Sequence, residues 1–208
     1  MAVSGLAWAG FALAHLIGNT PLLFGQAEAF NKYANFLTGL GGLLYAAEAV
    51  LTILLLMHLV LAFKTRKENK KARPFPYDNP GAKVGNRSLA SFTMPYTGIV
   101  IFIFLIVHIL TFKYGAYHEV TYDGETMRNL YKTVADSFAN PIYSLFYVFC
   151  MAAFGLHVGH GVGSGLQTFG LNHPRYNGTI AKVSTGYAYF VGGGNILITV
   201  VMFIKGNI

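Results

Sequence analysis

Five long apolar segments dominate this chain of 208 residues. Each is close to or longer than the about 20 residues that an α-helix needs to cross the hydrocarbon core of a bilayer. Helices are the expected form, because hydrocarbon offers the backbone no other hydrogen-bond partners and no stretch alternates like a barrel strand. The sequence predicts an all-α integral membrane protein with a single domain over 1–208 and spans at about 3–24, 38–63, 92–114, 141–168 and 182–204.

Composition supports this class and excludes others. Only 11% of the residues are charged, against about 25% in typical soluble domains. The formal net charge of +7 is best interpreted by its location in the loops, and we expect no nucleic-acid partner. A single cysteine, Cys150, excludes an internal disulfide and any multi-cysteine zinc or iron–sulfur site. No cleavable signal peptide and no internal repeat stand out.

The loop charges predict an orientation. The connection at 64–87 holds eight Lys or Arg residues against two acidic residues, whereas the loop at 113–140 holds three basic residues against four acidic ones. Loops rich in Lys and Arg stay on the cytoplasmic side. We therefore expect the second and fourth connections and the N-terminus in the cytoplasm, with the multi-pass protein in a cytoplasmic membrane.

Four histidines fall inside the predicted spans, each on a different helix. With this orientation, His15 and His108 lie toward the outer face, and His58 and His157 toward the inner face. In an up-down bundle of the first four helices, spans one and three are diagonal neighbours, as are spans two and four. Each pair would then face across the bundle at one depth, an arrangement that suits two stacked haems with an imidazole on each side of each iron.

Intramembrane histidines have other uses. A single one can form a hydrogen bond between helices, and that interpretation stays open for each taken alone. Glycines such as Gly98 and Gly155 permit close approach of a macrocycle, but they are equally typical of ordinary helix packing. The GxGxG run at 161–165 follows a helix rather than a strand, which argues against a phosphate-binding loop.

The chain resembles the di-haem cytochrome b membrane anchor of succinate:quinone oxidoreductases, a family that includes the fumarate reductases. The resemblance extends from the first span to the loop after the fourth. The segments that carry it are AHLIGN (14–19), AEAFNKYANFL (27–37), MHLVLAFKTRKENKKARPFPY (57–77), SLASFTMPYTG (88–98), VHILTF (107–112) and GLHVGHGVGSGLQTFGLNHPRY (155–176).

The resemblance implies two b haems, the outer held by His15 and His108 and the inner by His58 and His157. It implies a bacterial flavoprotein with covalent FAD and an iron–sulfur subunit on the cytoplasmic face, and it is compatible with a dimer of such heterotrimers. Electrons would pass through the haems to or from a quinone, for which menaquinone is the expectation. The chain itself would perform no succinate chemistry, and both succinate oxidation and fumarate reduction fit.

Further polar residues are candidates for these sites. His160 could contact a haem propionate or replace His157 as the ligand, and helix capping explains the serines near 90 equally well. Glu28 matches the family's quinone-site glutamate, although an exposed loop acid is an equal alternative. Glu48 is expected to hydrogen-bond another helix while protonated. The propionate candidates are Arg87, Ser88, Ser91, His160 and Gln167, and the quinone candidates are Glu28 and Glu48.

One position departs from the family. Some di-haem fumarate reductases carry a glutamate two residues before the ligand in the fourth span, where this chain has Gly155, which puts that proton route in doubt. Two other classes of membrane protein are alternatives. An integral-membrane di-iron or zinc enzyme could use the histidines, but HxxHH boxes and HExxH are absent. For a haem-free transporter, the sequence offers only Glu48 as an intramembrane acid that could belong to an ion pathway.

Overall fold

The computed structural model describes residues 1–72 and 89–208, and the side chains of Lys70 and of residues 89–92 are not described. Its elements in chain order are α1 (Ala2–Gly18), α2 (Pro21–Phe24), α3 (Ala27–Gly39), α4 (Gly42–Lys71), α5 (Leu89–Phe112), β1 (Glu119–Tyr122), β2 (Glu125–Arg128), α6 (Leu130–Ala139), α7 (Pro141–Leu166), η1 (Gln167–Leu171), α8 (Pro174–Ala188), η2 (Tyr189–Gly193) and α9 (Gly194–Gly206), where η1 and η2 are π-helical turns.

Among the residues that the structure describes, five helical segments are long and apolar enough to cross a membrane, which agrees with the expected number of spans and indicates a multi-pass membrane protein. They cover Ala2–Phe24, Gly42–Asn69, Thr93–Phe112, Pro141–Leu171 and Pro174–Gly206. The first, third and fourth agree closely with the sequence prediction. The second helix continues beyond the predicted end at 63, and the fifth begins earlier than predicted, at Pro174.

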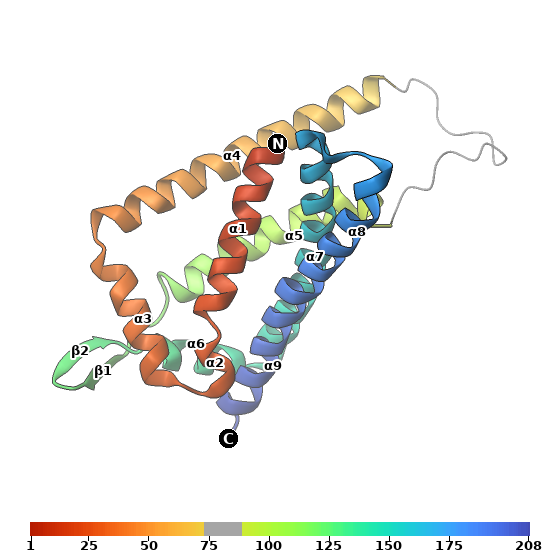
Figure 1. The fold of residues 1–208 in the computed structure, drawn as a ribbon. Helices are drawn as coiled ribbons and strands as arrows, with labels where there is room; N and C mark the ends of the chain where they lie inside the picture. The colour runs from red at the N-terminus through yellow and green to blue at the C-terminus, as the bar shows by residue number, and fades with distance from the viewer. Residues whose placement is uncertain (73–88) are drawn as a thin grey trace.

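The spans run alternately in opposite directions (Figure 1). The N-terminus and the last turns of α4 lie at one end of the molecule, called here the amino-terminal end. The C-terminus, α2 and α6 lie at the other, with the β1–β2 hairpin beside them, and this is called the hairpin end. The chain therefore has the alternation that an up-down arrangement requires.

Helix α7 is the centre of the packing. It contacts α1, α5, α8 and α9, whereas α4 packs mainly against α1 within the described residues. The main apolar core lies around Leu16, Tyr147, Val191 and Met202, which come from four different elements. No residue in the apolar part of α4 is buried inside the described protein. Helix α4 therefore presents most of its surface outward.

Two crossings of α7 depend on glycine. At Gly155, α7 meets Gly192 of η2, and a Cβ added at Gly192 would lie 2.9 Å from the Gly155 Cα. One turn further along, a Cβ at Gly159 would lie 2.7 Å from the Ala188 Cβ. Helices in lipid associate largely through such close packing, because lipid tails leave little hydrophobic driving force between them.

The hairpin end carries structure that the sequence analysis treated as plain loops. Helix α3 fills most of the first connection, and the loop after α5 contains an antiparallel hairpin, with Glu119 opposite Arg128, followed by α6. The small sheet is a departure from a purely helical fold. Asn31 of α3 is fully buried and joins these parts. Its amide donates to Asn129 Oδ1 at 3.0 Å, and its oxygen accepts from the Tyr131 amide at 2.9 Å.

Candidate functional site

The structure brings the four intramembrane histidines together as the two predicted pairs. The ring centroids of His15 in α1 and His108 in α5 are 5.7 Å apart, with an interplanar angle of 80°. Those of His58 in α4 and His157 in α7 are 6.5 Å apart, with an angle of 62°. The first pair lies toward the hairpin end and the second toward the amino-terminal end, so the pairs occupy different depths.

The separation of the two levels follows from α5. Thr97 contacts His157, and His108 lies eleven residues further along the same helix. At a rise of about 1.5 Å per residue, the two levels are about 16 Å apart along the helix axis. Within the described residues, the main packing of these helices is with other partners than the one that carries the facing histidine: α1 packs on α4 and α7, and α5 packs on α7. This is the relation expected of diagonal partners.

The spacing within each pair fits two imidazoles on one metal. Imidazole nitrogens bind first-row metals at about 2 Å, which sets two rings on opposite sides of the metal with centroids about 6 Å apart. The observed 5.7 and 6.5 Å lie on either side of this value. His15 is exposed and the other three rings are only partly covered by protein. Bare imidazole surface at membrane depth is costly, which favours a further group between the rings.

The number of donors also matters. Within residues 1–72 and 89–208, no cluster of three or more His, Cys, Asp or Glu side chains is placed to hold a metal ion. The histidines occur as pairs instead. A pair is the complement that a haem needs, since the macrocycle supplies the other four nitrogens to the iron. The donor set therefore fits haem better than the zinc or di-iron alternatives.

Three of the four rings have a hydroxyl next to Nδ1. Ser4 Oγ lies 3.3 Å from His58 Nδ1, Thr97 Oγ1 lies 3.1 Å from His157 Nδ1, and the Tyr147 hydroxyl lies 3.0 Å from His108 Nδ1. Histidines that bind metals through one ring nitrogen commonly use the other for such a contact, which fixes the ring orientation. In each of these rings Nε2 is the nitrogen that such a contact leaves available.

His15 is held differently. Its ring stacks on Phe11, with centroids 5.6 Å apart and an interplanar angle of 21°. Within the part of the chain that the structure describes, its ring nitrogens form no hydrogen bond. The aromatic contact therefore orients this ring, whereas hydroxyls orient the other three.

The propionate candidates stand as follows. His160 is partly exposed and lies one turn beyond His157 on α7, on the side of the amino-terminal end. Gln167 is exposed at the first position of η1. Arg87 and Ser88 lie outside the described residues, and so does the side chain of Ser91. The structure thus leaves His160 nearest to a histidine pair among the candidates whose side chains it describes.

The two glutamates lie apart from each other. Glu28 is in the first turn of α3, forms an ion pair with Lys32 at 2.7 Å, and lines a shallow hollow with Gly25 and Gln26. Glu48 forms an ion pair with Lys113, just beyond the end of α5. The contact that Glu48 forms with another segment is therefore an ion pair to Lys113, next to the end of α5. The pairing also raises the Lys113 pKa, chiefly through its hydrogen bond to Glu48.

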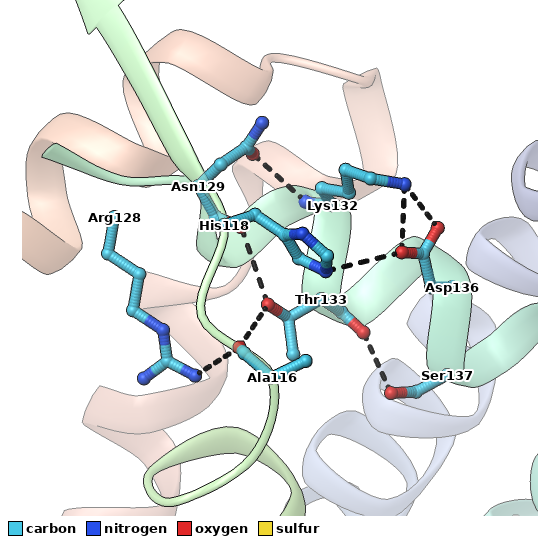
Figure 2. A network of polar contacts seen from close by, with 8 residues as sticks. All are labelled: Ala116, His118, Arg128, Asn129, Lys132, Thr133, Asp136 and Ser137. Carbon is cyan, nitrogen blue, oxygen red and sulfur yellow. Dashed lines mark hydrogen bonds and ion pairs between the residues drawn. The ribbon is translucent and has the colours of Figure 1, made fainter. Parts of the chain in front are cut away.

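A polar network at the hairpin end joins the loop after α5 to α6 (Figure 2). The Ala116 carbonyl accepts from Arg128 at 3.0 Å and from the Thr133 hydroxyl at 3.1 Å. His118 Nε2 lies 3.6 Å from Asp136, whose carboxylate also accepts from Lys132 at 2.8 Å. Because Lys132 already neutralises Asp136, the network fits a clamp that holds the loop to α6 rather than a metal site.

The sequence analysis missed the residues that contact the histidines. Ser4, Thr97 and Tyr147 were not candidates, although each shares a helix with one of the four ligand candidates. Each contacts a histidine of another helix, so spacing along one helix does not identify these partners. Comparison with protein-family models, curated proteins and solved structures found no match to this chain.

Proposed function

We propose that this chain is the di-haem cytochrome b membrane anchor of a succinate:quinone oxidoreductase, with five spans in a bacterial cytoplasmic membrane and its N-terminus in the cytoplasm. It carries electrons between an iron–sulfur subunit and a quinone. The support is the resemblance in sequence together with the histidine geometry.

One observation carries the proposal. Four histidines from four separate spans form two pairs, with ring centroids 5.7 and 6.5 Å apart, at levels about 16 Å apart along α5. Isolated helix–helix hydrogen bonds would not require two facing pairs with similar spacing. The Nδ1 atoms of His58, His157 and His108 also contact hydroxyls rather than the other ring of the pair.

The chain's own residues would have distinct tasks. His15 and His108 hold the haem toward the hairpin end, and His58 and His157 hold the haem toward the amino-terminal end. When bound, the haems supply one-electron transfer across the bundle. The surrounding helices keep water from the rings and fix their orientation, which sets the potential of each haem together with its burial.

Quinone chemistry needs proton exchange near the hairpin end. A quinone takes up two protons on reduction, and a quinol releases two on oxidation, so a carboxylate beside the site is useful. Glu28 is the better placed of the two candidates, because its side chain is 54% exposed and borders a hollow at the first turn of α3. Both carboxylates are in ion pairs, Glu28 with Lys32 and Glu48 with Lys113, and the Glu48 side chain is the less exposed of the two at 35%.

The partners follow from the same proposal. A flavoprotein with FAD and an iron–sulfur subunit would dock at the amino-terminal end, where the haem of His58 and His157 would receive or deliver electrons. The basic connection at 64–87 belongs to this side. The quinone, taken here as menaquinone, would react at the opposite end, and a dimer of heterotrimers is compatible with the outward surface of α4.

The test is optical. The full chain, expressed with an adequate haem supply and purified in detergent, should show a b-type reduced-minus-oxidised spectrum and two haems per chain in a pyridine haemochrome assay. His15→Ala and His58→Ala should each remove one haem, and a different one. His118→Ala is the matched control, since His118 lies outside the spans, and it should retain both. A wild-type chain without haem, or two variants that remove the same haem, would refute the proposal.

A further inference from the structure

Helices α1 and α5 share a sequence pattern that is too short to appear as a repeat. In each, a methionine is followed three positions later by a hydroxyl residue, then directly by a glycine, and a histidine comes eleven positions after the hydroxyl. The pattern consists of Met1, Ser4, Gly5 and His15 in α1, and Met94, Thr97, Gly98 and His108 in α5.

The two hydroxyls make equivalent contacts. In α1, Ser4 Oγ donates to the Met1 carbonyl at 2.9 Å and lies 3.3 Å from His58 Nδ1. In α5, Thr97 Oγ1 lies 3.1 Å from the Met94 carbonyl, to which it can donate, and 3.1 Å from His157 Nδ1. Each inner histidine thus meets the same combination of a helix carbonyl and a side-chain hydroxyl on the neighbouring helix.

The glycines make room for the rings. A Cβ added at Gly5 would lie 3.2 Å from His58 Cε1, and one added at Gly98 would lie 3.4 Å from His157 Cε1. These distances are at or below the lower limit of ordinary carbon contacts. The glycine after each hydroxyl therefore lets the imidazole edge lie against the helix backbone.

The hydrogen bonds determine which ring nitrogen carries the proton. Each hydroxyl has one proton, and a carbonyl of its own helix is placed to accept it. When the hydroxyl donates its proton to that carbonyl, the hydroxyl accepts from Nδ1, and this assignment makes the histidine the donor with its proton on Nδ1. Neutral imidazole with a proton on Nδ1 has its lone pair on Nε2, which is the form that can bind iron there.

We propose that Ser4 and Thr97 are positioning residues that hold His58 and His157 in this tautomer and orientation, so that Nε2 of each faces the inner haem. This inference rests on the proposed function. Hydrogen bonding from Nδ1–H makes Nε2 a more basic ligand, which favours the oxidised iron. Ser4 and Thr97 therefore lower the potential of the inner haem.

The spacing gives each helix two tasks. Eleven residues complete three turns of α-helix, so Ser4 and His15 lie on one face of α1, and Thr97 and His108 on one face of α5. Each of these helices supplies a ligand at the outer level and supports a ligand at the inner level. The outer level lacks this twin arrangement: His108 meets the Tyr147 hydroxyl, and His15 stacks on Phe11.

The experiment compares Ser4→Ala, Thr97→Val and Thr97→Ser in the full chain purified with its haems. The readouts are the midpoint potential of each haem by optical titration and the low-spin ferric signals by electron paramagnetic resonance, which report ligand orientation. Signals are assigned to the outer and inner haems with His15→Ala and His58→Ala. Thr199→Val is the control, because Thr199 is also a buried threonine whose hydroxyl donates to a carbonyl of its own helix, at Asn195.

Ser4→Ala and Thr97→Val should each raise the potential and shift the signal of the inner haem alone, or cause loss of that haem alone. Thr97→Ser should restore wild-type values, and Thr199→Val should leave both haems unchanged. Unchanged inner-haem values in both variants, or an equal change in Thr199→Val, would overturn the inference while leaving two haems and the proposed function intact. A wild-type preparation without haem would instead refute the proposed function.

Discussion

The crossing of α7 and η2 at Gly155 and Gly192 allows a test with one added methyl group. A Cβ at Gly192 would lie 2.9 Å from the Gly155 Cα and 3.3 Å from the Met151 carbonyl oxygen. Both neighbours are backbone atoms, so no side chain can rotate away to relieve the contact. Gly192→Ala must therefore push η2 away from α7. The contact point on α7 is Gly155, two residues before His157.

The expected magnitude combines two opposing effects. Overpacking a tightly packed site costs about 1–3 kcal/mol. Replacing glycine by alanine within a helix returns up to about 1 kcal/mol, because glycine loses more backbone entropy on folding. The difference of these ranges is a loss of about 0–3 kcal/mol in the free energy of unfolding for Gly192→Ala.

Gly193→Ala is the matched control. Gly193 is the next residue in the same π-helical turn, and an added Cβ there would meet nothing within 4 Å. This variant should be neutral or gain up to about 1 kcal/mol. Thermal unfolding of both variants, followed by circular dichroism in one detergent at one scan rate, should give a melting temperature lower than wild type for Gly192→Ala only. The offset should be about 2–4 °C per kcal/mol for a chain of this size.

Equal melting temperatures for the two variants would refute the reasoning. That result would mean that η2 and α7 are not in backbone contact at this crossing. A greater loss of stability for Gly193→Ala than for Gly192→Ala would refute it more directly, since it would place the close approach on the other face of η2.

Three other predictions concern single contacts. Under the proposed function, Tyr147→Phe removes the hydroxyl next to His108 Nδ1, and the haem of His15 and His108 should bind about 10–100-fold more weakly in a haem-transfer assay, with the other haem unaffected. Asn31→Ala leaves buried partners unsatisfied between α3 and α6, which should cost about 1–3 kcal/mol in denaturant unfolding and increase amide exchange at Tyr131. The hydrogen bond from Lys32 lowers the Asp123 pKa below its ordinary value of 3.8. The ion pair of Lys32 and Asp123 therefore stabilises the fold fully above pH 3.8, and this stabilisation is lost as the pH falls through the lowered Asp123 pKa. A spin label on the hairpin should therefore become more mobile in that acidic range, and Asp123→Asn should make its mobility independent of pH there.

The spans were predictable because apolar length is a strong signal, but their ends were not. The second span was predicted to end at 63 because the first lysine, Lys64, comes next. Lys, Arg and Glu are good helix formers, however, so α4 continues to Lys71. Hydropathy marks where a helix leaves the bilayer rather than where it stops. The fifth helix begins at Pro174 because a proline suits the first turn and His173 accepts a hydrogen bond from the Arg175 amide.

The pairing of the histidines was predictable from depth, because orientation and helical rise place each ring along the membrane normal. The partners of their Nδ1 atoms were not, since these depend on which faces of neighbouring helices meet. The ion pair of Glu48 with Lys113 was missed for a related reason: depth placed Glu48 inside a span, while the long Lys113 side chain reaches it from beyond the end of α5. Both the Nδ1 partners and the partner of Glu48 are thus determined by tertiary contacts between helices.

Gly155 also has a physical explanation. A Cβ at this position would lie 3.3 Å from the Ala188 carbonyl oxygen and 3.5 Å from the Gly192 Cα. A side chain at this position would start in a tight contact with the Ala188 carbonyl oxygen, so the backbone of the fifth span would have to shift slightly to admit it. The glycine noted in the sequence is therefore consistent with close packing of α7 against the fifth span.

The interval of three complete turns between Ser4 and His15, and between Thr97 and His108, makes the middle of these helices intolerant of length change. Inserting or deleting one residue there would rotate one functional group by about 100° and shift it by about 1.5 Å relative to the other. A bilayer of different thickness must therefore be accommodated elsewhere, at the polar ends of α4 and α8. In related sequences, we expect these two intervals to keep a constant length of eleven residues, while the chain around them gains or loses residues.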